Sequence, residues 1–372
     1  MTRPLPKGWC PNAYHPMESG DGWIVRIKPH LGRFTAAQVL DICDLAQRFG
    51  SGQLDLTSRA NLQIRGVLAQ DHPALIKALA TAGVLDRDEI SEFRRNILTQ
   101  PFWTDGGVTM RLAKDLAHRL SELPDLPAKF GFAVDTGVVP CLRNASADVR
   151  LERHKTHILV YGDGADTARV CEEDAAVDAA IALACWYADC RDATQDRMRK
   201  LLAEQSAPGL WDDLALPPHA ANQVGPGSTP NGCMVGVPFG AIHADDLVRL
   251  MNQTNTAAIR LAPNRLLLLE NVPVVPDLSF VETRASATLQ TQACPGAPHC
   301  VSASVQTRAI ARRFARAGLH VSGCAKGCAA PRASAWTLVG RDGAFDLVRN
   351  GAPWEEPSRR SLRLAEIEEA LR

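Results

Sequence analysis

The sequence predicts an α+β protein built around an internal duplication. Two stretches, one starting near Trp23 and the other near Met234, show the same order of strand, helix and strand. Within them, residues 54–67 and 259–272 align without a gap at an offset of 205 positions. Identical residues occur at Leu56 and Leu261, Leu62 and Leu267, and Val67 and Val272. These identities are few, but together with the shared element order they favour a duplicated unit.

Both copies carry clear signals for strands and helices. Alternation of apolar and polar residues predicts strands in the first copy at 23–27, 54–56 and 62–64. A helix is expected from Thr35, where Gln38 completes a capping box, to Gly50. A second helix is expected from Asp71 to about Gly83. The second copy predicts a strand at 234–238, a helix at 243–252 and a further strand stretch over 259–272.

The other segments predict a mixed region, a linker and a C-terminal hairpin. Between the copies we expect helices at 108–123, 175–190 and 194–205, and strands at 130–134 and 157–161. Residues 206–231 are rich in Pro, Gly and Ala, which is typical of a linker. Near the C-terminus, 335–339 and 345–348 predict a hairpin about Arg341-Asp-Gly343, followed by a short exposed helix over 364–371.

Composition and charge exclude several classes of function. Lys plus Arg and Asp plus Glu both number 41, so no global charge favours nucleic acid. No stretch approaches the roughly 18 apolar residues of a membrane span, and the N-terminal residues lack the pattern of a signal peptide. The 11 cysteines have no small secreted framework around them. We therefore expect a cytoplasmic protein with reduced thiols and without membrane or nucleic-acid partners.

Four cysteines near the C-terminus are the strongest chemical signal. They form two pairs, Cys294 with Cys300 and Cys324 with Cys328, and Gly or Pro residues edge each pair. Four thiolates from two tight loops are what a [4Fe–4S] cluster requires, because each iron takes one cysteine sulfur. A structural zinc site is an alternative, although its cysteine pairs are usually closer together than the first pair here. Buried, inert cysteines are the other alternative.

A row of polar residues along the predicted strand at 62–64 is a candidate binding surface. Strand alternation places on one face Arg59, Asn61, Gln63 and Arg65. Such a row of donors suits an anionic ligand, because arginine binds carboxylates bidentately. An ordinary solvated sheet face is the alternative. Arg95 and Lys129 are further basic residues, each a weak signal by itself.

These motifs together resemble those of the siroheme-containing sulfite and nitrite reductases. The resemblance is carried by the spacing of the cysteine pairs, by Leu56–Gly66 as the T-x-R-x-x-x-Q-x-x-G strand motif, and by Arg95-Asn96-Ile97 as the R-N-[IV] element. It implies a duplicated nitrite/sulfite reductase-like architecture with two ferredoxin-like half-domains and two mixed α/β domains. The expected units are half-domains at 1–84 and 225–278, an α/β domain at 85–215 and a [4Fe–4S] cluster domain at 279–372.

One position departs from the reductase pattern. Arg59 and Arg95 match the two arginines of the reductase anion pocket, and Lys129 matches the first of its two lysines, but Gly131 stands at the second. The missing cation weakens the case for reducing sulfite or nitrite. The chain instead resembles the precorrin-3B synthase branch of the same superfamily, at Cys10-Pro11 to Gly22, at Val321–Ala329 and at Leu338–Gly340.

That resemblance implies an oxidoreductase of aerobic cobalamin biosynthesis, a monooxygenase acting on a tetrapyrrole. It would hydroxylate precorrin-3A at C20 with O2 and close a γ-lactone. Arg59, Arg95 and Lys129 would be catalytic, and the substrate would contact Arg59, Asn61, Gln63, Arg65, Arg95 and Lys129. The cluster, held by Cys294, Cys300, Cys324 and Cys328, would relay electrons, and siroheme is not expected.

The resemblance leaves other components open. The branch is associated with a mononuclear non-haem iron, for which the candidate ligands are His15, His154, His157 and Cys10. Electrons would come from an external donor, an NADH-linked reductase or a ferredoxin, because the chain lacks a dinucleotide fingerprint. Two alternatives remain, a siroheme-dependent sulfite or nitrite reductase and an iron–sulfur electron-transfer subunit.

Overall fold

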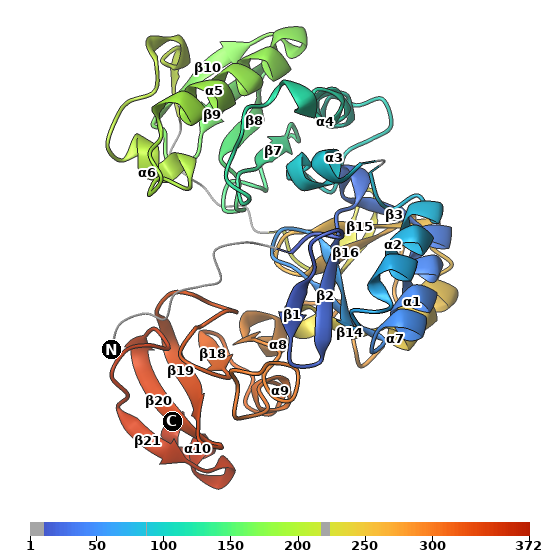
Figure 1. Ribbon diagram of the computed structural model, residues 1–372, viewed down its shortest axis with the longest axis vertical. Coiled ribbons are helices and arrows are strands. Elements are labelled where there is room, and N and C mark those ends of the chain that lie inside the picture. The colour runs from blue at the N-terminus through green and yellow to red at the C-terminus, as the bar shows by residue number, and fades with distance from the viewer. Residues whose placement is uncertain (1–10, 87, 217–223) are drawn as a thin grey trace.

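The computed structural model describes residues 11–86, 88–216 and 224–372. Figure 1 shows a mixed domain in green, a C-terminal domain in red, and between them in space a pair of half-domains in blue and yellow. Four sheets carry the architecture, two of them in the half-domains. The mixed α/β composition and the duplicated arrangement confirm the predicted fold class.

The first half-domain sheet has the order β1-β2-β5-β4-β14 and the second has the order β12-β13-β16-β15-β3. The first consists of β1 (Met17–Ser19), β2 (Gly22–Ile27), β5 (Leu62–Val67), β4 (Gln53–Leu56) and β14 (Ala241–His243). The second consists of β12 (Gly227–Thr229), β13 (Gly232–Gly236), β16 (Leu266–Glu270), β15 (Ala258–Ala262) and β3 (Arg33–Thr35). Each sheet therefore takes its last strand from the opposite copy.

Strand register confirms the duplication predicted from the aligned leucines. Leu56 of β4 pairs with Leu62 of β5, and the equivalent Leu261 of β15 pairs with Leu267 of β16. The helices covering the sheets are α1 (Ala36–Phe49), α2 (His72–Thr81) and α7 (Ala244–Thr254). A short 3-10 turn precedes the exchanged strand in each copy, η1 (His30–Gly32) and η5 (Pro238–Gly240). The two copies thus share strands, pairing and turns.

Helix α1 begins where the sequence predicts. The Thr35 hydroxyl accepts a hydrogen bond from the Gln38 amide, and the Gln38 side chain accepts one from the Thr35 amide, which completes the capping box. The buried face of α1, which includes Val39 and Ile42, packs in the core shared by the half-domains. Capping and apolar spacing together account for this helix.

The two copies contain the same cross-strand ion pair with the charges exchanged. Arg65 Nη1 lies 3.2 Å from Asp55 Oδ2, and Arg260 Nε lies 2.6 Å from Glu270 Oε1. Positions 55 and 65 align with 260 and 270 in the duplication. All four side chains are nearly fully buried. Arg260 also donates to the carbonyls of Pro101 and Trp103, so it joins the half-domains to the mixed domain.

We expect Arg260→Gln to destabilise the protein by about 3 kcal/mol, because it leaves buried acceptors without their cationic donor. The midpoint of urea unfolding, followed by circular dichroism, measures this loss. Arg372→Gln is the matched control, since Arg372 pairs with Glu368 at the exposed surface. Its loss should cost less than about 0.5 kcal/mol. Equal midpoints for the two variants would contradict the prediction.

The mixed domain is a six-stranded sheet with helices packed beside it. The strand order is β11-β10-β9-β8-β7-β6. The strands are β6 (Ile97–Thr99), β7 (Phe132–Asp135), β8 (Val149–His154), β9 (His157–Gly162), β10 (Thr167–Cys171) and β11 (Leu214–Ala215). The helices are α3 (Glu89–Arg94), α4 (Val108–His118), α5 (Ala176–Cys190) and α6 (Met198–Leu202), with 3-10 turns η2 (Leu120–Glu122), η3 (Glu173–Ala175) and η4 (Gly209–Trp211).

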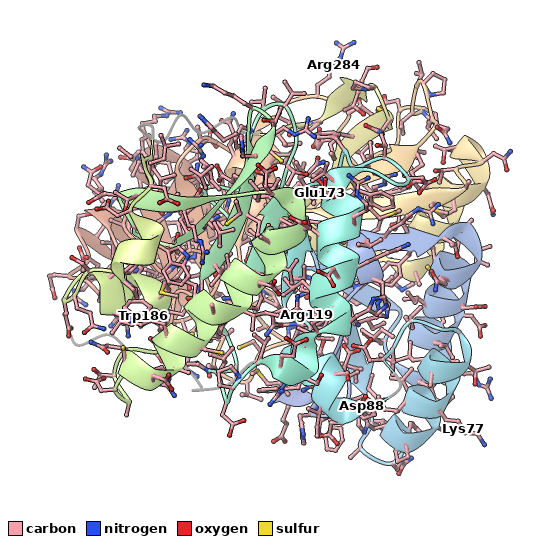
Figure 2. All side chains as sticks on the ribbon, turned by 90° about the horizontal axis from the view of Figure 1, so that it is seen from above. Lys77, Asp88, Arg119, Glu173, Trp186 and Arg284 are labelled. Atoms are coloured by element: carbon pink, nitrogen blue, oxygen red, sulfur yellow. The ribbon has the colours of Figure 1, made fainter. Side chains whose placement is uncertain are left out.

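Helices α4 and α5 lie side by side on this domain, and Figure 2 shows Arg119 at their junction. Arg119 Nη1 lies 2.6 Å from Asp178 Oδ1 of α5. The predicted helix over 194–205 is wrong in its first turn. The Asp192 carboxylate accepts hydrogen bonds from the amides of Thr194 and Gln195, so a turn forms there and only α6 is helical.

The C-terminal domain holds the cysteine loops. Its sheet has the order β17-β18-β19-β20-β21. The strands are β17 (Gln292–Ala293), β18 (Leu319–Ser322), β19 (Ser334–Arg341), β20 (Ala344–Gly351) and β21 (Arg359–Leu362), and the helices are α8 (Ala287–Gln290), α9 (Arg308–Arg313) and α10 (Leu364–Ala370). The predicted hairpin of β19 and β20 is confirmed. The terminal helix is not fully exposed as predicted, because Ile367 is buried in the domain core.

The predicted linker is partly structured. Within 206–231 lie η4, β11 and β12, while residues 217–223 fall outside the described residues. No helix in the described ranges is both long and apolar enough to cross a membrane.

Candidate functional site

Strands β2 and β5 present a polar face that begins the candidate site. Arg26 of β2 lies opposite Gln63 of β5 in the register, and the Gln63 amide oxygen faces the Arg26 guanidinium in the orientation that satisfies both groups. The sequence prediction placed Arg59 and Asn61 on this strand, which is wrong, because β5 begins at Leu62. Both residues lie in the turn between β4 and β5.

A basic cavity opens beside this turn. It has an empty volume of about 450 Å³, partly open to solvent. The residues that give it polar or basic character are Lys28, Arg59, Asn61, Arg95, Asn96, Thr99 and Ser146. A smaller adjoining chamber of about 320 Å³ shares Lys28, Arg59, Asn61 and Asn96 and adds Arg26. We call these two spaces together the basic cavity.

An apolar cavity lies next to the basic one. Its empty volume is about 1010 Å³, part of which is open to solvent. Apolar side chains line most of it, among them Ile90, Leu126 and Phe132. It shares Phe93 and Asn96 with the smaller chamber of the basic cavity. A ligand with an apolar body and anionic edges would find both kinds of surface here.

Arg59 connects the half-domain to the mixed domain at the cavity wall. Its Nη1 donates to the Lys129 carbonyl at 3.1 Å, and its Nη2 donates to the Ser146 hydroxyl at 2.7 Å. The residue is only partly buried, so its guanidinium is accessible from the cavity. This placement agrees with the predicted role of Arg59 as a ligand contact, which stays a prediction.

Lys28 is a cavity residue that the sequence reasoning missed. Its ammonium donates to the carbonyls of Glu92 at 2.6 Å and Phe93 at 3.1 Å. Burial lowers its pKa to about 8, and the nearby Arg95 and Arg26 charges act in the same direction against Glu92. The signal was present, because strand alternation in β2 continues from Arg26 to Lys28.

Arg95 lines the cavity, but most of its hydrogen-bond donors already bind other groups of the protein. Its Nε donates to Asp86 at 2.7 Å, its Nη2 to Glu92 at 2.9 Å and its Nη1 to the Lys28 carbonyl at 2.7 Å. The side chain is nearly fully buried. Arg95 therefore positions the Lys28 backbone, with two of its five N–H donors left for a ligand.

Thr99 supplies a polar atom without a partner. Its hydroxyl is buried and makes no hydrogen bond to the described residues. It lines the basic cavity on the side of Gly32, where an added Cβ would lie 3.2 Å from this hydroxyl. A buried, unsatisfied hydroxyl in a cavity wall is suited to a ligand or a bound water.

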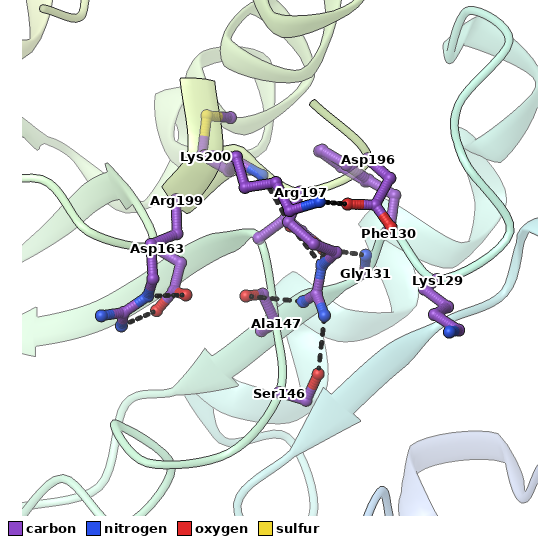
Figure 3. Close-up of polar contacts among 12 residues, drawn as sticks. Lys129, Phe130, Gly131, Ser146, Ala147, Asp163, Asp196, Arg197, Arg199 and Lys200 are labelled. Atoms are coloured by element: carbon purple, nitrogen blue, oxygen red, sulfur yellow. Dashed lines mark hydrogen bonds and ion pairs between the residues drawn. The ribbon is translucent and has the colours of Figure 1, made fainter. Parts of the chain in front are cut away.

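Gly131 has a packing reason for lacking a side chain. A Cβ at this position would lie 2.8 Å from the Asn96 carbonyl oxygen, closer than real Cβ atoms approach. The Gly131 amide donates to Asp148, and the same carboxylate binds Arg197. Arg197 also donates to Ser146 (Figure 3), which accepts from Arg59 as well. Arg197 and Ser146 were missed because they are distant in sequence and match no motif.

The remaining predicted substrate residues lie outside the lining of the basic cavity. Arg65 is buried and binds Asp21 and Asp55, so its guanidinium is used within the protein. Lys129 contributes its carbonyl to Arg59, and its ammonium takes no part in the polar contacts drawn in Figure 3. Gln63 faces Arg26 beside the cavity. The predicted roles of these side chains stay predictions.

The four C-terminal cysteines come together in the C-terminal domain. Burial raises the pKa of Cys328 to about 11, with further contributions from the nearby thiolates of Cys294, Cys324 and Cys300. Burial also raises the pKa of Cys324. The Gly323 amide donates to Cys294 Sγ at 3.2 Å, the kind of N–H to sulfur contact that iron–sulfur sites use.

Glycine allows the two cysteine loops to approach. A Cβ on Gly323 would lie 2.6 Å from the Ala303 Cβ and 3.3 Å from the Gly296 Cα. The four thiols thus fit a [4Fe–4S] cluster in number, chemistry and convergence. Their present spacing is not that of a preformed metal site, because no group of three or more His, Cys, Asp or Glu in the described chain could hold a metal ion.

Arg65 connects the polar sheet face to the first cysteine loop. Its Nη2 donates to the carbonyl of His299 at 3.0 Å, and the Ser19 hydroxyl donates to the same carbonyl at 2.7 Å. The Gly20 amide donates to it as well, at 3.3 Å. The loop that carries Cys300 is therefore docked on the β1–β2 hairpin beside β5, and Arg65 is a positioning residue for it.

The candidate ligands of a second iron do not converge. His15 pairs with Glu89 near α3, whereas His154 and His157 face each other across the β8–β9 hairpin, where His157 pairs with Glu172. Cys10 lies outside the described residues. The described candidates therefore do not fit a mononuclear iron site.

Comparisons with known proteins agree with this geometry. A family model of the nitrite/sulfite reductase ferredoxin-like half domain matches residues 15–82, which include β1 to α2. A precorrin-3B synthase of Sinorhizobium sp is 28% identical over 405 aligned positions, covering 95% of this chain and 84% of that protein. The chain is thus similar to the nitrite and sulfite reductases over its first half-domain and to a precorrin-3B synthase along nearly its whole length.

Two further proteins match less of the chain or only its fold. A ferredoxin–nitrite reductase of Synechococcus elongatus is 26% identical over 35% of this chain and 27% of that protein. The structure of the Mycobacterium tuberculosis NirA protein superposes with a TM-score of 0.62 at 15% identity, covering 94% of this chain and 79% of that one. The second likeness shows the fold, and the near full-length match in sequence is to precorrin-3B synthase.

Proposed function

We propose that this protein is an O2-dependent enzyme of the precorrin-3B synthase type, which hydroxylates precorrin-3A at C20 and closes a γ-lactone. The observation that carries the proposal is sequence similarity to a precorrin-3B synthase along 95% of the chain. The basic cavity with its adjoining apolar cavity supports it, because the substrate is a flat apolar macrocycle fringed with carboxylates.

The residues of the cavity bind and orient the substrate. Arg59 and Lys28 hold peripheral carboxylates in charge-assisted hydrogen bonds, while the apolar cavity beside them accepts part of the macrocycle. Fixing the periphery determines which meso carbon meets the oxidant, a positioning effect. A [4Fe–4S] cluster held by Cys294, Cys300, Cys324 and Cys328 supplies electrons one at a time when it is bound.

The net reaction is a monooxygenation. One oxygen atom of O2 enters the product as the C20 hydroxyl, as the carboxylate of the ring A acetate closes onto C1. The other atom leaves as water, which takes two electrons and two protons from an external donor. An NADH-linked reductase or a ferredoxin is the class of donor that the reaction requires.

Gly131 supports oxidation of the tetrapyrrole over reduction of sulfite or nitrite. A second lysine at this position would collide with the Asn96 carbonyl, so the four-cation pocket of the reductases does not fit this backbone. Arg197, which binds Asp148 and Ser146 nearby, leaves a positive charge in the region. The positive charge of Arg197 thus lies behind the residues that line the basic cavity. In the reductase pattern, the second lysine would face the bound anion directly.

The test is aerobic turnover of precorrin-3A by the purified holoprotein with NADH and a reductase. Mass spectrometry should find a product with one added oxygen, which carries 18O when 18O2 is supplied. Sulfite and nitrite, offered with reduced methyl viologen, should give no sulfide or ammonia. Siroheme bands in the absorption spectrum together with sulfide or ammonia formation would overturn the proposal.

Substrate affinity should weaken as the pH rises through about 8, because Lys28 then loses its charge. Below this pH the Lys28 ammonium is charged and attracts a substrate carboxylate. Binding should therefore weaken as the pH increases. We expect roughly tenfold weaker binding once the charge is gone. Anaerobic titration of precorrin-3A, followed by tryptophan fluorescence between pH 6.5 and 9.5, measures the change.

Lys28→Gln and Lys28→Arg are the matched variants for this pH dependence. The glutamine variant should bind weakly at every pH, and the arginine variant should keep its affinity above pH 8, since guanidinium stays charged. A wild-type pH profile that Lys28→Gln leaves unchanged would show that another group titrates.

A further inference from the structure

The second copy of the duplicated unit contains a cationic residue that has no counterpart in the first. Arg265 occupies the turn between β15 and β16, and it aligns with Ala60 in the turn that lines the basic cavity. Both residues have positive φ, 54° for Ala60 and 65° for Arg265. The two turns therefore share a positive φ at this position, although Asn264 adds a second one in the later copy, and only the later copy carries a guanidinium at this point.

The surroundings of the two turns are also equivalent. Gly32 lines the basic cavity, and a Cβ on it would lie 3.4 Å from the Leu261 carbonyl oxygen. The equivalent Gly240 would bring a Cβ to 2.5 Å from the Leu56 carbonyl oxygen and 3.0 Å from Arg265 Cδ. The stem of Arg265 thus lies beside Gly240, where the Thr99 hydroxyl lies beside Gly32 in the other copy.

Arg265, which is partly buried, lies near buried nitrogen atoms that lack acceptors. Within the described chain its guanidinium makes no hydrogen bond or ion pair, and Arg308 Nε is buried without a partner. His320 of β18 is fully buried, and neither of its ring nitrogens has a partner among the described residues. A buried nitrogen without a hydrogen-bond partner lowers the stability of the fold by about 1–3 kcal/mol, so an acceptor bound among these donors would be favourable.

The local charges leave an excess of one cation. Arg308 Nη2 lies 2.7 Å from Asp55 Oδ1, and Asp55 also binds Arg65, which in turn binds Asp21. Two carboxylates thus pair with Arg65 and Arg308. The charge of Asp55 also acts on Arg265, but no carboxylate forms an ion pair with Arg265 in the described chain. Burial lowers the pKa of Arg265 to about 10, with the Arg308 charge adding to the effect. With a pKa of about 10, Arg265 still carries a positive charge at neutral pH.

His320 is suited to donate to an anion while uncharged. Burial lowers its pKa to about 4, and the charge of Arg265 contributes, which shows that the two groups are near each other. A neutral imidazole carries one N–H donor. A ligand that accepts hydrogen bonds and carries one negative charge would satisfy both this ring and the unpaired guanidinium.

We propose that Arg265, Arg308 and His320 form a second anion site, the counterpart of the basic cavity, which binds a carboxylate. The site adjoins the cysteine loops, because Arg308 follows Thr307, whose hydroxyl donates to the Cys294 carbonyl. Two sources can supply the carboxylate, a peripheral group of the tetrapyrrole or a free small acid. The first source rests on the proposed function, and the second does not.

The test compares Arg265→Gln with Arg313→Gln, an exposed arginine of α9, in the holoprotein. Anaerobic titration with precorrin-3A, without reductant, gives the dissociation constant. Thermal unfolding in sodium acetate against sodium chloride at equal ionic strength reports a free carboxylate. If the tetrapyrrole supplies the group, Arg265→Gln should weaken precorrin-3A binding tenfold or more and Arg313→Gln should not.

If a small acid supplies it, acetate should raise the melting temperature of the wild type but not of Arg265→Gln. Equal precorrin-3A binding and equal acetate response in wild type and Arg265→Gln would overturn the site. Arg265→Lys, which keeps the charge, should recover most of the affinity lost in the glutamine variant. An intact cluster absorption band and an unlowered melting temperature in Arg265→Gln exclude misfolding as the cause of weaker binding.

The two proposals fail in different ways. A wild-type protein that neither binds nor converts precorrin-3A contradicts the proposed function, and the acetate response still decides the anion site. A wild-type protein that converts precorrin-3A, with Arg265→Gln identical to it in precorrin-3A binding and in acetate response, contradicts the anion site alone.

Discussion

Replacing Cys324 with serine should remove the broad visible absorption of the holoprotein and lower its bound iron tenfold or more. A serine hydroxyl is a hard, weakly acidic donor and a poor substitute for a thiolate on iron. In the proposed cluster the other three cysteines bind the same iron–sulfur core, so the loss of Cys324 should affect the whole cluster and not one iron. Absorption spectroscopy and iron analysis of the purified variant measure the effect.

Cys190→Ser is the matched control for this variant. Cys190 is an exposed cysteine at the end of α5 and belongs to a different domain. It should keep the absorption band and the iron content of the wild type. Unchanged iron in Cys324→Ser would show that the paired cysteines are not ligands, and zinc in place of iron in the wild type would favour a structural zinc site.

Replacing Arg59 with alanine should lower kcat/KM for precorrin-3A about a hundredfold, which corresponds to roughly 3 kcal/mol of lost interaction. The guanidinium lines the basic cavity and also holds Ser146 and the Lys129 carbonyl. Its removal deletes a cation for the substrate and loosens the wall of the mixed domain. Steady-state assays under saturating O2 and reductant measure the loss.

Two further variants separate these contributions of Arg59. Arg59→Lys keeps the charge but not the two-pronged contact, so an intermediate loss is expected. Arg284→Ala removes an exposed arginine, labelled in Figure 2, and should leave kcat/KM unchanged. All three variants should keep the cluster absorption. A wild-type kcat/KM in Arg59→Ala would show that the basic cavity does not bind the reacting substrate.

Local signals in the sequence predicted most of the fold. The Thr35–Gln38 capping box, the paired leucines of the two copies and the hairpin of β19 and β20 all depend on residues close in sequence. The alternation argument failed where it was extended into the turn at Arg59 and Asn61, because a row of alternating polar residues does not by itself mark where a strand begins. Likewise, Asp192 caps a turn that helical periodicity could not reveal.

The candidate site was only partly predictable. Its cysteines and Arg59 belong to spaced motifs, and the strand signal around Arg26 could have been extended to Lys28. Ser146 and Arg197 reach the site only through long-range packing of the mixed domain, which leaves no spaced pattern in the chain. Arg65 matched a motif, but the carboxylates that bind it, Asp21 and Asp55, are visible only once the strands are paired.

The exchanged edge strands also constrain how the chain can fold. The first sheet is completed by β14 and the second by β3, and the whole mixed domain lies between these strands in sequence. Neither sheet can close during synthesis until the later copy has left the ribosome. Such distant pairing slows folding and leaves strand edges exposed in the meantime. The mixed domain, whose strands are all local to it, can fold first and hold the two unfinished halves near each other.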